Sequence, residues 1–294
     1  MTAVALAPLT LFAVALLKVR MQRIAMKLGR MVQSVLPKGE LAAPISRPTF
    51  LNRVDRRSCL EIGPFDCPVV EGAGVRYFDV LDSEQLADRS ARHGRDADAS
   101  TIPHIDYVSP TGDLAIVDRT FTAAVSSHCI EHQPDLIAHL LAVGRLLEPG
   151  GRYFVLCPDK RYCFDYFHRL SVRADIDQAH AEERRLHDCS RIRAHTENAT
   201  HNSAMKHWLG LHGRPRVEND SKFSAIADEK CAASARGEYV DVHAWIFSDE
   251  SFNEIVGKLC DEDVIPFELL YVTRTHFGSV EFFAELRKKG RPTP

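Results

Sequence analysis

Two serines and a histidine follow a short apolar run near the middle of the chain. Residues 122–125 read as a strand, and Ser126, Ser127 and His128 come directly after it. In a parallel sheet, ligands bind at the edge formed by the carboxyl ends of the strands. An imidazole titrates near neutral pH, so it can take a proton from a reacting hydroxyl group there. His128 is therefore the first candidate for a catalytic base. A histidine that only bonds the neighbouring backbone is the alternative.

Acidic side chains lie at the ends of two further runs. Residues 58–62 form an apolar run that contains Glu61, and residues 75–80 form a second run that contains Asp79. Asp82 follows closely and is the alternative to Asp79 if the strand is shifted. Both runs read as strands of a parallel sheet, so these carboxylates are expected at the same edge as His128.

A helix and a further strand are expected after His128. Pro134 suits the first position of a helix. Apolar residues recur at helical spacing behind it, namely Leu136, Leu140, Val143 and Leu147. Gly150 and Gly151 then end the helix, and residues 153–156 form a short apolar run typical of a strand that is covered on both faces. The segment 121–158 is thus one half of an α/β domain.

The remaining elements complete this pattern. Further elements are expected as a helix from Ser83 to about residue 92, a strand at 104–108, a helix at 249–259, and two strands at 264–273 and 279–287. The predicted fold class is α/β, with a Rossmann-like, seven-stranded, mostly parallel sheet that ends in an antiparallel hairpin.

A long polar section, residues 159–245, interrupts the alternation of strands and helices. It contains eight of the fourteen histidines and reads as an inserted helical or loop section that could serve as a substrate lid. The predicted organisation of the chain therefore has four parts: residues 1–50 as an N-terminal helix and linker, 51–158 as a cofactor-binding half, 159–245 as the insertion, and 246–290 as a helix and hairpin that complete the sheet.

The composition fits a globular protein with a full core. The chain has 294 residues, of which 45% are hydrophobic and 26% charged, and its net charge is −3. This charge, with no base-reading motif, speaks against a nucleic-acid partner. The eight cysteines include no C-x-x-C pair, which predicts reduced thiols in a cytoplasmic protein and no disulfide framework. Nothing in the sequence indicates an oligomeric state.

The N-terminal residues suggest contact with a membrane. Residues 2–17 carry no charge, but as a helix they reach only about 24 Å across a hydrocarbon core of about 30 Å. Six basic residues and no acid follow within residues 18–38. Residues 2–36 are therefore expected as an amphipathic helix at the inner membrane surface. A helix packed on the domain, or an upstream start that the cell does not use, are the alternatives.

Five motifs in order resemble the class I S-adenosylmethionine-dependent methyltransferases, and most closely the methyltransferase type 11 group. They are L-E-I-G-P-F at 60–65, Y-F-D-V at 77–80, G-D-L at 112–114, S-S-H-C-I-E-H at 126–132 and L-E-P-G-G at 147–151. The E-H pair and the L-x-P-G-G turn are the most specific of these. The resemblance covers about residues 58–158, together with the terminal helix and hairpin, and it implies S-adenosyl-L-methionine as the cofactor.

The resemblance also implies roles for the residues after the first strand and the fourth. Glu61, Gly63 and Phe65 would belong to the cofactor loop, with the glycine allowing close approach and the carboxylate facing the ammonium group of the cofactor. Ser127 and His128 would lie beside its methionine part and methyl group.

Two acids would bind the nucleoside part of the cofactor. By the same resemblance, Asp79 would accept hydrogen bonds from the ribose hydroxyls. Asp113 would accept a hydrogen bond from the adenine amino group, while the amide of Leu114 reaches a ring nitrogen.

One departure from the family concerns the first motif, which usually reads E-x-G-x-G-x-G but here has a single glycine followed by Pro64. Only eleven residues separate Gly63 from the second strand, so the usual first helix is expected to be short or absent.

Methyl transfer is an in-line displacement at a carbon that the sulfonium already activates. Alignment of the reacting groups can lower the activation barrier by about 7 to 11 kcal/mol, which is more than a positioned base contributes. Such an enzyme needs no fixed catalytic triad, so the sequence identifies the cofactor better than the acceptor. The leading hypothesis is O-methylation of a small molecule, a saccharide or a lipid-linked glycan. The alternative is a non-catalytic cofactor-binding or scaffold subunit with a degenerate first motif. A nicotinamide enzyme is disfavoured because G-x-G-x-x-G is absent.

Candidates for acceptor binding lie in the insertion. Lys160 and Arg161 follow the fifth strand and could bind an anionic acceptor, or form a solvated charge cluster. His201 and Trp208 could contact a sugar or a ring, although aromatic side chains more often pack. The spacing of His201, His207 and His212 fits no compact metal signature, so no metal site is predicted.

Overall fold

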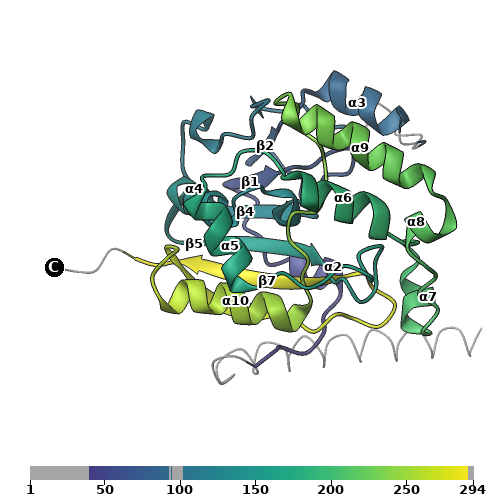
Figure 1. The fold of residues 1–294 in the computed structure, drawn as a ribbon. Helices are drawn as coiled ribbons and strands as arrows, with labels where there is room; N and C mark the ends of the chain where they lie inside the picture. Colours follow the sequence, from purple (N-terminus) through teal and green to yellow (C-terminus); the bar gives the residue numbers. More distant parts are fainter. Residues whose placement is uncertain (1–39, 93, 95–101, 291–294) are drawn as a thin grey trace, which may run out of the picture. The chain divides into compact units, whose positions relative to one another are not determined.

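The computed structural model describes residues 40–92, 94 and 102–290 (Figure 1). The described residues from Leu41 onward belong to one compact unit. The predicted amphipathic helix at residues 2–36 lies outside the described residues. Within the part that is described, no helix is both long enough and apolar enough to cross a membrane.

The sheet has seven strands in the order β3-β2-β1-β4-β5-β7-β6. The strands are β1 (Cys59–Ile62), β2 (Val75–Asp79), β3 (Tyr107–Val108), β4 (Phe121–Ser127), β5 (Leu147–Pro158), β6 (Phe267–Val272) and β7 (Glu281–Lys288). The first five pair in parallel, and β7 is antiparallel to both β5 and β6. This confirms the predicted fold class, a mostly parallel Rossmann-like sheet closed by an antiparallel hairpin.

Side chains of the central strands alternate between two cores. Ala124 of β4 packs with α4 (Leu136–Leu146) and α10 (Asp249–Asp261) on one face. Ala123 and Val125 lie on the other face, where α2 (Arg47–Leu51) contributes Phe50. The ring of Phe50 stacks on Phe283 with centroids 4.8 Å apart. Part of the predicted linker therefore belongs to the core of the domain.

Two boundaries around α4 differ from the prediction. Asp135 caps the helix by accepting the amide of Ala138 at 2.9 Å, so Pro134 precedes the cap and does not begin the helix. Leu147 does not extend the helical stripe, because it pairs with Phe121 and opens β5 before a register shift. Pairing with β4 thus takes precedence over the helical spacing.

The loop after β1 and the helix after β2 lie where they were predicted, but the cap of that helix differs. Residues 63–74, all of which the structure describes, form turns and no helix, as expected. Helix α3 runs from Ser83 to Arg92, but its first turn is capped by Asp82, which accepts the amide of Gln85 at 2.8 Å. The hydroxyl of Ser83 instead donates to the carbonyl of Pro103.

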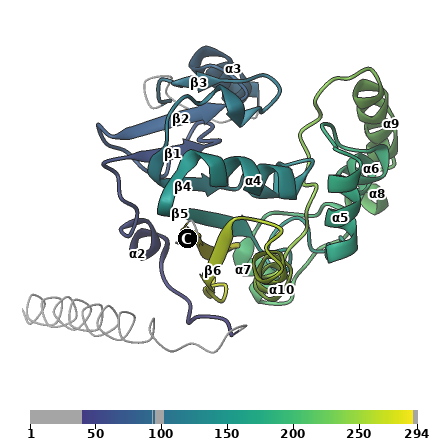
Figure 2. The ribbon, with the colours of Figure 1, turned by 90° about the vertical axis from the view of Figure 1, so that its left-hand side faces the viewer.

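The insertion is helical and lies beyond the carboxyl end of β5. Its helices are α5 (Arg173–Ala181), α6 (Cys189–Asn198), α7 (Ala204–Trp208), α8 (Arg216–Asn219) and α9 (Lys222–Ala235). Figure 2 shows α5, α6, α8 and α9 grouped at one side of the sheet, and in Figure 1 the arrow of β5 points toward them.

A disulfide between Cys189 and Cys231 joins α6 to α9. The prediction of reduced thiols throughout is therefore wrong for this pair, while the other six cysteines are free. The two residues are 42 positions apart, and only the packing of α6 on α9 brings their Cα atoms to 4.9 Å.

Candidate active site

Gly63 begins the loop after β1 in a conformation that favours glycine. Its φ is +71°, and its amide donates to the carbonyl of Phe78 at 2.8 Å. A Cβ at this position would lie 3.0 Å from the Sγ of Cys129, which follows β4. The glycine therefore allows the loop after β1 to approach the loop after β4 closely.

Glu61 is buried within β1 and holds this loop in place. One carboxylate oxygen accepts the amide of Val69 at 2.8 Å and the other accepts the amide of Val70 at 3.1 Å. Burial raises the pKa of Glu61 to about 7, and the two amides oppose that shift. Both oxygens thus already have partners within the protein, which differs from the expected role of facing an ammonium group.

Asp79 ends β2 and touches the same loop. Its Oδ1 accepts the amide of Val80 at 2.7 Å, and its Oδ2 lies 3.4 Å from the amide nitrogen of Phe65, which has a φ of +52°. Burial raises the pKa of Asp79, and the backbone amides counteract this. Asp82 caps α3, so Asp79 is the acid that lies against the loop after β1.

Asp113 and Leu114 lie in the turn after β3. The Asp113 carboxylate caps a 3-10 turn, η2 (Leu114–Ile116), by accepting the amide of Ala115 at 2.9 Å, and Leu114 is buried. The turn is tied to β2, since the amide of Ser109 donates to the carbonyl of Asp79. The structure therefore brings Gly63, Asp79 and the Asp113 turn to one edge of the sheet.

Ser127 and His128 follow at the end of β4. The hydroxyl of Ser127 accepts a hydrogen bond of 2.6 Å from Arg47 of α2, a contact that the sequence analysis missed. Ser126 points into the core, where its hydroxyl lies 2.7 Å from that of Tyr153. Ser127, not Ser126, is thus the serine beside the candidate site.

His128 lies in the left-handed region with a φ of +50°, which is uncommon for a residue with a side chain. Its Nε2 is 3.0 Å from Glu281 of β7, and its Nδ1 is 3.8 Å from Glu131. Burial opposes protonation, but the bond to Glu281 and the charge of Glu131 outweigh it, so the pKa of His128 is raised. The side chain keeps 38% of its surface exposed, so solvent reaches it.

The predicted acceptor-binding cations are engaged within the protein. Arg161 forms two hydrogen bonds with Asp159, of 2.9 and 2.6 Å, and a third of 2.5 Å with Asp249. Lys160 donates to the carbonyl of Tyr166 at 2.8 Å, and burial lowers its pKa. Asp159 and Asp249 are buried carboxylates that need a counter-charge, and this explains the position of Arg161.

His201 and Trp208 also have internal partners. Trp208 stacks on Tyr162 with ring centroids 3.8 Å apart and donates to the carbonyl of Ser279. His201 bonds the carbonyl of Leu211 at 2.8 Å through Nε2. Both side chains therefore help to stabilise the insertion, and their role in acceptor binding stays a prediction.

The insertion contributes to a small pocket beside the end of β2. A cavity of about 340 Å³ is lined by Leu81, Arg89, Arg92, Tyr239 and Asp241. Arg89 of α3 pairs with Asp241, and the latter also lies 2.8 Å from His132. Tyr239 and Asp241 end the insertion, so this section reaches the candidate site. No local motif marks these two residues, and the sequence analysis missed them.

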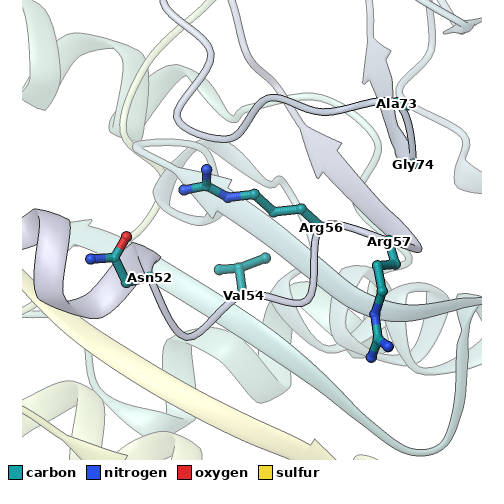
Figure 3. A pocket seen from close by; sticks show the side chains of 6 residues that line it. All are labelled: Asn52, Val54, Arg56, Arg57, Ala73 and Gly74. Carbon is teal, nitrogen blue, oxygen red and sulfur yellow. The ribbon is translucent and has the colours of Figure 1, made fainter.

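A second and larger depression lies at the opposite edge. Figure 3 shows the residues that line it, which include Arg56 and Arg57 before β1 and Gly74 before β2. The volume of this depression is about 670 Å³. These positions precede the strands, whereas the loop glycine and the acids follow them. Because ligands bind at the carboxyl ends of parallel strands, the smaller pocket is in the expected place and the larger one is not.

Comparison with known proteins gives neighbours in fold only. No family model and no curated protein matches the chain. One similar solved structure is described as "Conversion of a Disulfide Bond into a Thioacetal Group during Echinomycin Biosynthesis". Its sequence is 12% identical to this chain, the TM-score is 0.41, and the match covers 87% of this chain and 86% of that one. An S-adenosyl-L-methionine-dependent methyltransferase from Methanococcus maripaludis is 13% identical, with a TM-score of 0.37 and coverage of 84% and 85%. A methyltransferase of this kind from Mesorhizobium loti is 14% identical, with a TM-score of 0.37 and coverage of 82% and 96%.

Proposed function

We propose that the chain is an S-adenosyl-L-methionine-dependent methyltransferase. The observation that carries the proposal is the placement of Gly63, Asp79 and Asp113 after β1, β2 and β3, three neighbouring strands of a sheet with the order β3-β2-β1-β4-β5-β7-β6. A glycine that permits close approach and two acids at successive strand ends suit a ligand with a nucleoside at one end and a charged chain at the other.

The cofactor lies along this edge of the sheet. Asp79 accepts hydrogen bonds from the ribose hydroxyls, and the turn of Asp113 and Leu114 contacts the adenine. The pocket lined by Leu81 and Arg89 adjoins Asp79 along the chain and marks the entry to the ribose position. Ser127 and His128 then lie on the methionine side, together with Gly63.

The reaction is transfer of the methyl group to an oxygen. The acceptor oxygen forms a bond to the methyl carbon as the carbon–sulfur bond breaks, and the sulfonium becomes a neutral thioether. The proton of the hydroxyl passes to His128, whose imidazole is oriented by the 3.0 Å contact with Glu281. Exposure of His128 supports this role, because a base must reach the acceptor.

The acceptor is a small molecule, a saccharide or a lipid-linked glycan. The insertion follows β5 directly along the chain, which supports a role for it in acceptor binding. Attachment of residues 2–36 to the inner membrane surface would bring the protein to a lipid-linked acceptor in the cytoplasm. Fractionation of the full chain and of a chain that begins at Met31 tests the attachment, and equal solubility of the two would contradict it.

One observation favours the non-catalytic alternative. The carboxylate of Glu61 is occupied by Val69 and Val70, and the loop after β1 has Pro64 where the family usually has flexible positions. A protein that binds the cofactor without turnover would tolerate such a loop. Binding and turnover therefore have to be measured separately.

Calorimetry with S-adenosylhomocysteine tests the cofactor site. We expect micromolar binding to the full chain, lost in Asp79→Ala and kept in the control Asp82→Ala, since Asp82 only caps α3 at the same edge. Thermal unfolding of both variants checks that they fold. Absence of binding to the unaltered chain would overturn the proposal. Binding without methyl transfer to any compound in a metabolite extract with labelled cofactor would favour the non-catalytic alternative.

A further inference from the structure

Glu131 is a buried carboxylate without a hydrogen-bond partner. It lies after β4 in a short 3-10 turn, η3 (Ile130–His132), and none of its surface is exposed. Neither Oε1 nor Oε2 has a hydrogen bond with any described residue. A buried carboxylate is unfavourable unless a positive group or hydrogen bonds compensate its charge. This carboxylate therefore requires a positive group close to it.

Three imidazole nitrogens surround the same oxygen of Glu131. The Nε2 of His132 and the Nδ1 of His128 each lie 3.8 Å from Oε1, and the Nε2 of His243 lies 3.9 Å from it. These separations are too long for hydrogen bonds. They suit atoms that share an ion, because two ligands at about 2.1 Å from one metal lie at most about 4.2 Å apart.

The other nitrogen of each imidazole contacts a second carboxylate. His132 Nδ1 lies 2.8 Å from Asp241 as an ion pair without hydrogen-bond geometry, whereas His243 Nδ1 shares a hydrogen bond of 2.6 Å with Asp165. His128 shows the same arrangement with Glu281. Metal-binding histidines almost always donate their second N–H to a carboxylate or carbonyl, which fixes the ring and leaves the first nitrogen free for the ion.

The backbone holds the two parts of the cluster together. The carbonyl of Glu131 accepts the amide of Ala244 at 2.7 Å and that of Trp245 at 3.1 Å. These bonds place His243, from the end of the insertion, over the turn that follows β4. The position of His243 relative to Glu131 is therefore built into the fold.

We propose that Glu131, His132 and His243 bind a divalent transition-metal ion. The three ligand atoms lie within 4.8 Å of one another, so a small shift of the side chains would bring all of them to the spacing of metal ligands. Two imidazoles and one carboxylate leave further coordination positions open and suit Zn²⁺, Fe²⁺, Ni²⁺ or Cu²⁺ better than Mg²⁺ or Ca²⁺. His128 stands next to the site, at the same oxygen of Glu131.

A second grouping, of Asp165, His195 and His243, is less suited to an ion. The 2.6 Å between Asp165 and His243 is a hydrogen-bond distance, and the backbone amide of His243 donates to the Nδ1 of His195 at 3.2 Å. Asp165 and His195 thus orient His243, while its Nε2 remains directed at Glu131.

The site would also serve the proposed reaction. Asp241 lines the pocket beside β2 and contacts His132, while His128 lies 3.8 Å from Glu131, so the proposed ligands adjoin both the pocket and the candidate base. A metal there would polarise the acceptor oxygen and favour loss of its proton. This role depends on the proposed methyl transfer, whereas binding of the ion does not.

Metal titration of the full chain tests the proposal. The chain is treated with a chelator, dialysed and titrated with Zn²⁺ and with Co²⁺, with calorimetry for stoichiometry and visible absorption for Co²⁺ coordination. We expect one tight site per chain. His243→Ala should weaken it by more than about 100-fold, and Asp165→Asn by about 10- to 100-fold, because an orienting carboxylate is lost.

A histidine outside the cluster provides the control. His180 is half-exposed and contacts Asp135, so His180→Ala should bind the ion as tightly as the unaltered chain. Circular dichroism establishes that each variant folds, and Asp165→Asn and Glu131→Gln provide independent readings if His243→Ala does not fold. No tight site in the unaltered chain, or a site that His243→Ala and Asp165→Asn leave unchanged, would overturn the proposal. If the chain binds the metal ion but not S-adenosylhomocysteine, the methyltransferase function is refuted and the metal site is not.

Discussion

The Nε2 of His128 lies 3.0 Å from Oε2 of Glu281, a contact between residues 153 positions apart. It joins the residue after β4 to the first residue of β7, across the intervening strand β5. The antiparallel strand thus places a carboxylate at the carboxyl ends of the parallel strands. This orientation of an imidazole by an acid is the arrangement that general bases use.

Replacement of His128 should affect turnover more than cofactor binding. We expect His128→Ala to lower methyl transfer by about 10²- to 10⁴-fold, the usual contribution of a positioned base, with binding of S-adenosylhomocysteine unchanged. Transfer of labelled methyl groups into an extract and calorimetry measure the two effects. His276→Ala, in the loop before β7, is the control and should keep full activity. Full turnover in His128→Ala would remove this residue from the mechanism.

Gly63→Ala should destabilise the protein both through its backbone and through Cys129. A side chain at a φ of +71° costs about 1–2 kcal/mol, and the 3.0 Å contact of the new Cβ with Sγ adds to it. Gly150 has a φ of +78° with nothing within 4 Å of such a Cβ, so Gly150→Ala isolates the backbone cost. Urea unfolding gives both values. Equal losses in the two variants would show that contact with Cys129 is relaxed without cost.

His139 should make stability depend on pH below neutrality. Burial lowers the pKa of His139 to about 4 from an ordinary value of 6.5. Between these values the unfolded chain binds a proton that the folded protein excludes, so stability is full above pH 6.5 and falls as the pH drops toward 4. From pH 6.5 to 5 the loss is about 2 kcal/mol.

His139→Gln tests this dependence. The variant cannot become charged, and its amide can replace the contact of the imidazole with the Tyr153 hydroxyl at 3.2 Å. Urea unfolding at pH 7 and pH 5 should show a smaller loss of stability for the variant than for the unaltered chain. An identical loss in both proteins would assign the acid sensitivity to other buried histidines, such as His187 and His195, whose pKa values burial also lowers.

Removal of Arg161 should weaken the fold rather than acceptor binding. Its guanidinium neutralises Asp159 and Asp249, both buried, so Arg161→Ala leaves two uncompensated charges and should cost about 3–5 kcal/mol. Arg169→Ala is the control, because that arginine pairs with Asp175 at the surface and should cost less than about 1 kcal/mol. Chemical unfolding measures both losses. A stable Arg161→Ala protein with a raised KM for an anionic acceptor would restore the original prediction for this residue.

Reduction of the Cys189–Cys231 bond should loosen the insertion. The bond closes a loop between residues 42 positions apart. Its loss should lower the free energy of unfolding by about 2–4 kcal/mol, as is typical for a disulfide. We expect Cys189→Ser to unfold at lower urea concentration, whereas Cys67→Ser, at an exposed free cysteine, should not. Mass spectrometry under alkylating conditions shows whether the bond is present. A single population of eight alkylated thiols would mean that the bond does not form in the expressed protein.

The class of fold, and the edge of the sheet at which the candidate site lies, could be predicted from the sequence. Apolar runs of strand length, and the hydrophobic spacing of α4 and α10, are local properties, so they were visible in the chain. Glycine and acids at strand ends located Gly63, Asp79 and Asp113, because parallel strands bring their carboxyl ends to one edge. The boundaries at Pro134 and Leu147 were wrong, since capping by Asp135 and pairing with Phe121 compete with local preference.

The contacts between distant side chains could not be predicted from the sequence, because they depend on how the chain packs. Arg47 reaches Ser127, Asp241 reaches His132, and His243 faces Glu131, although each pair is separated by 80 residues or more. The path of the insertion back over the sheet brings them together, and no spacing within the chain encodes that path. For the same reason, the histidines of the proposed metal site were not visible as a motif, and Arg161 could not be assigned to two buried carboxylates rather than to an acceptor.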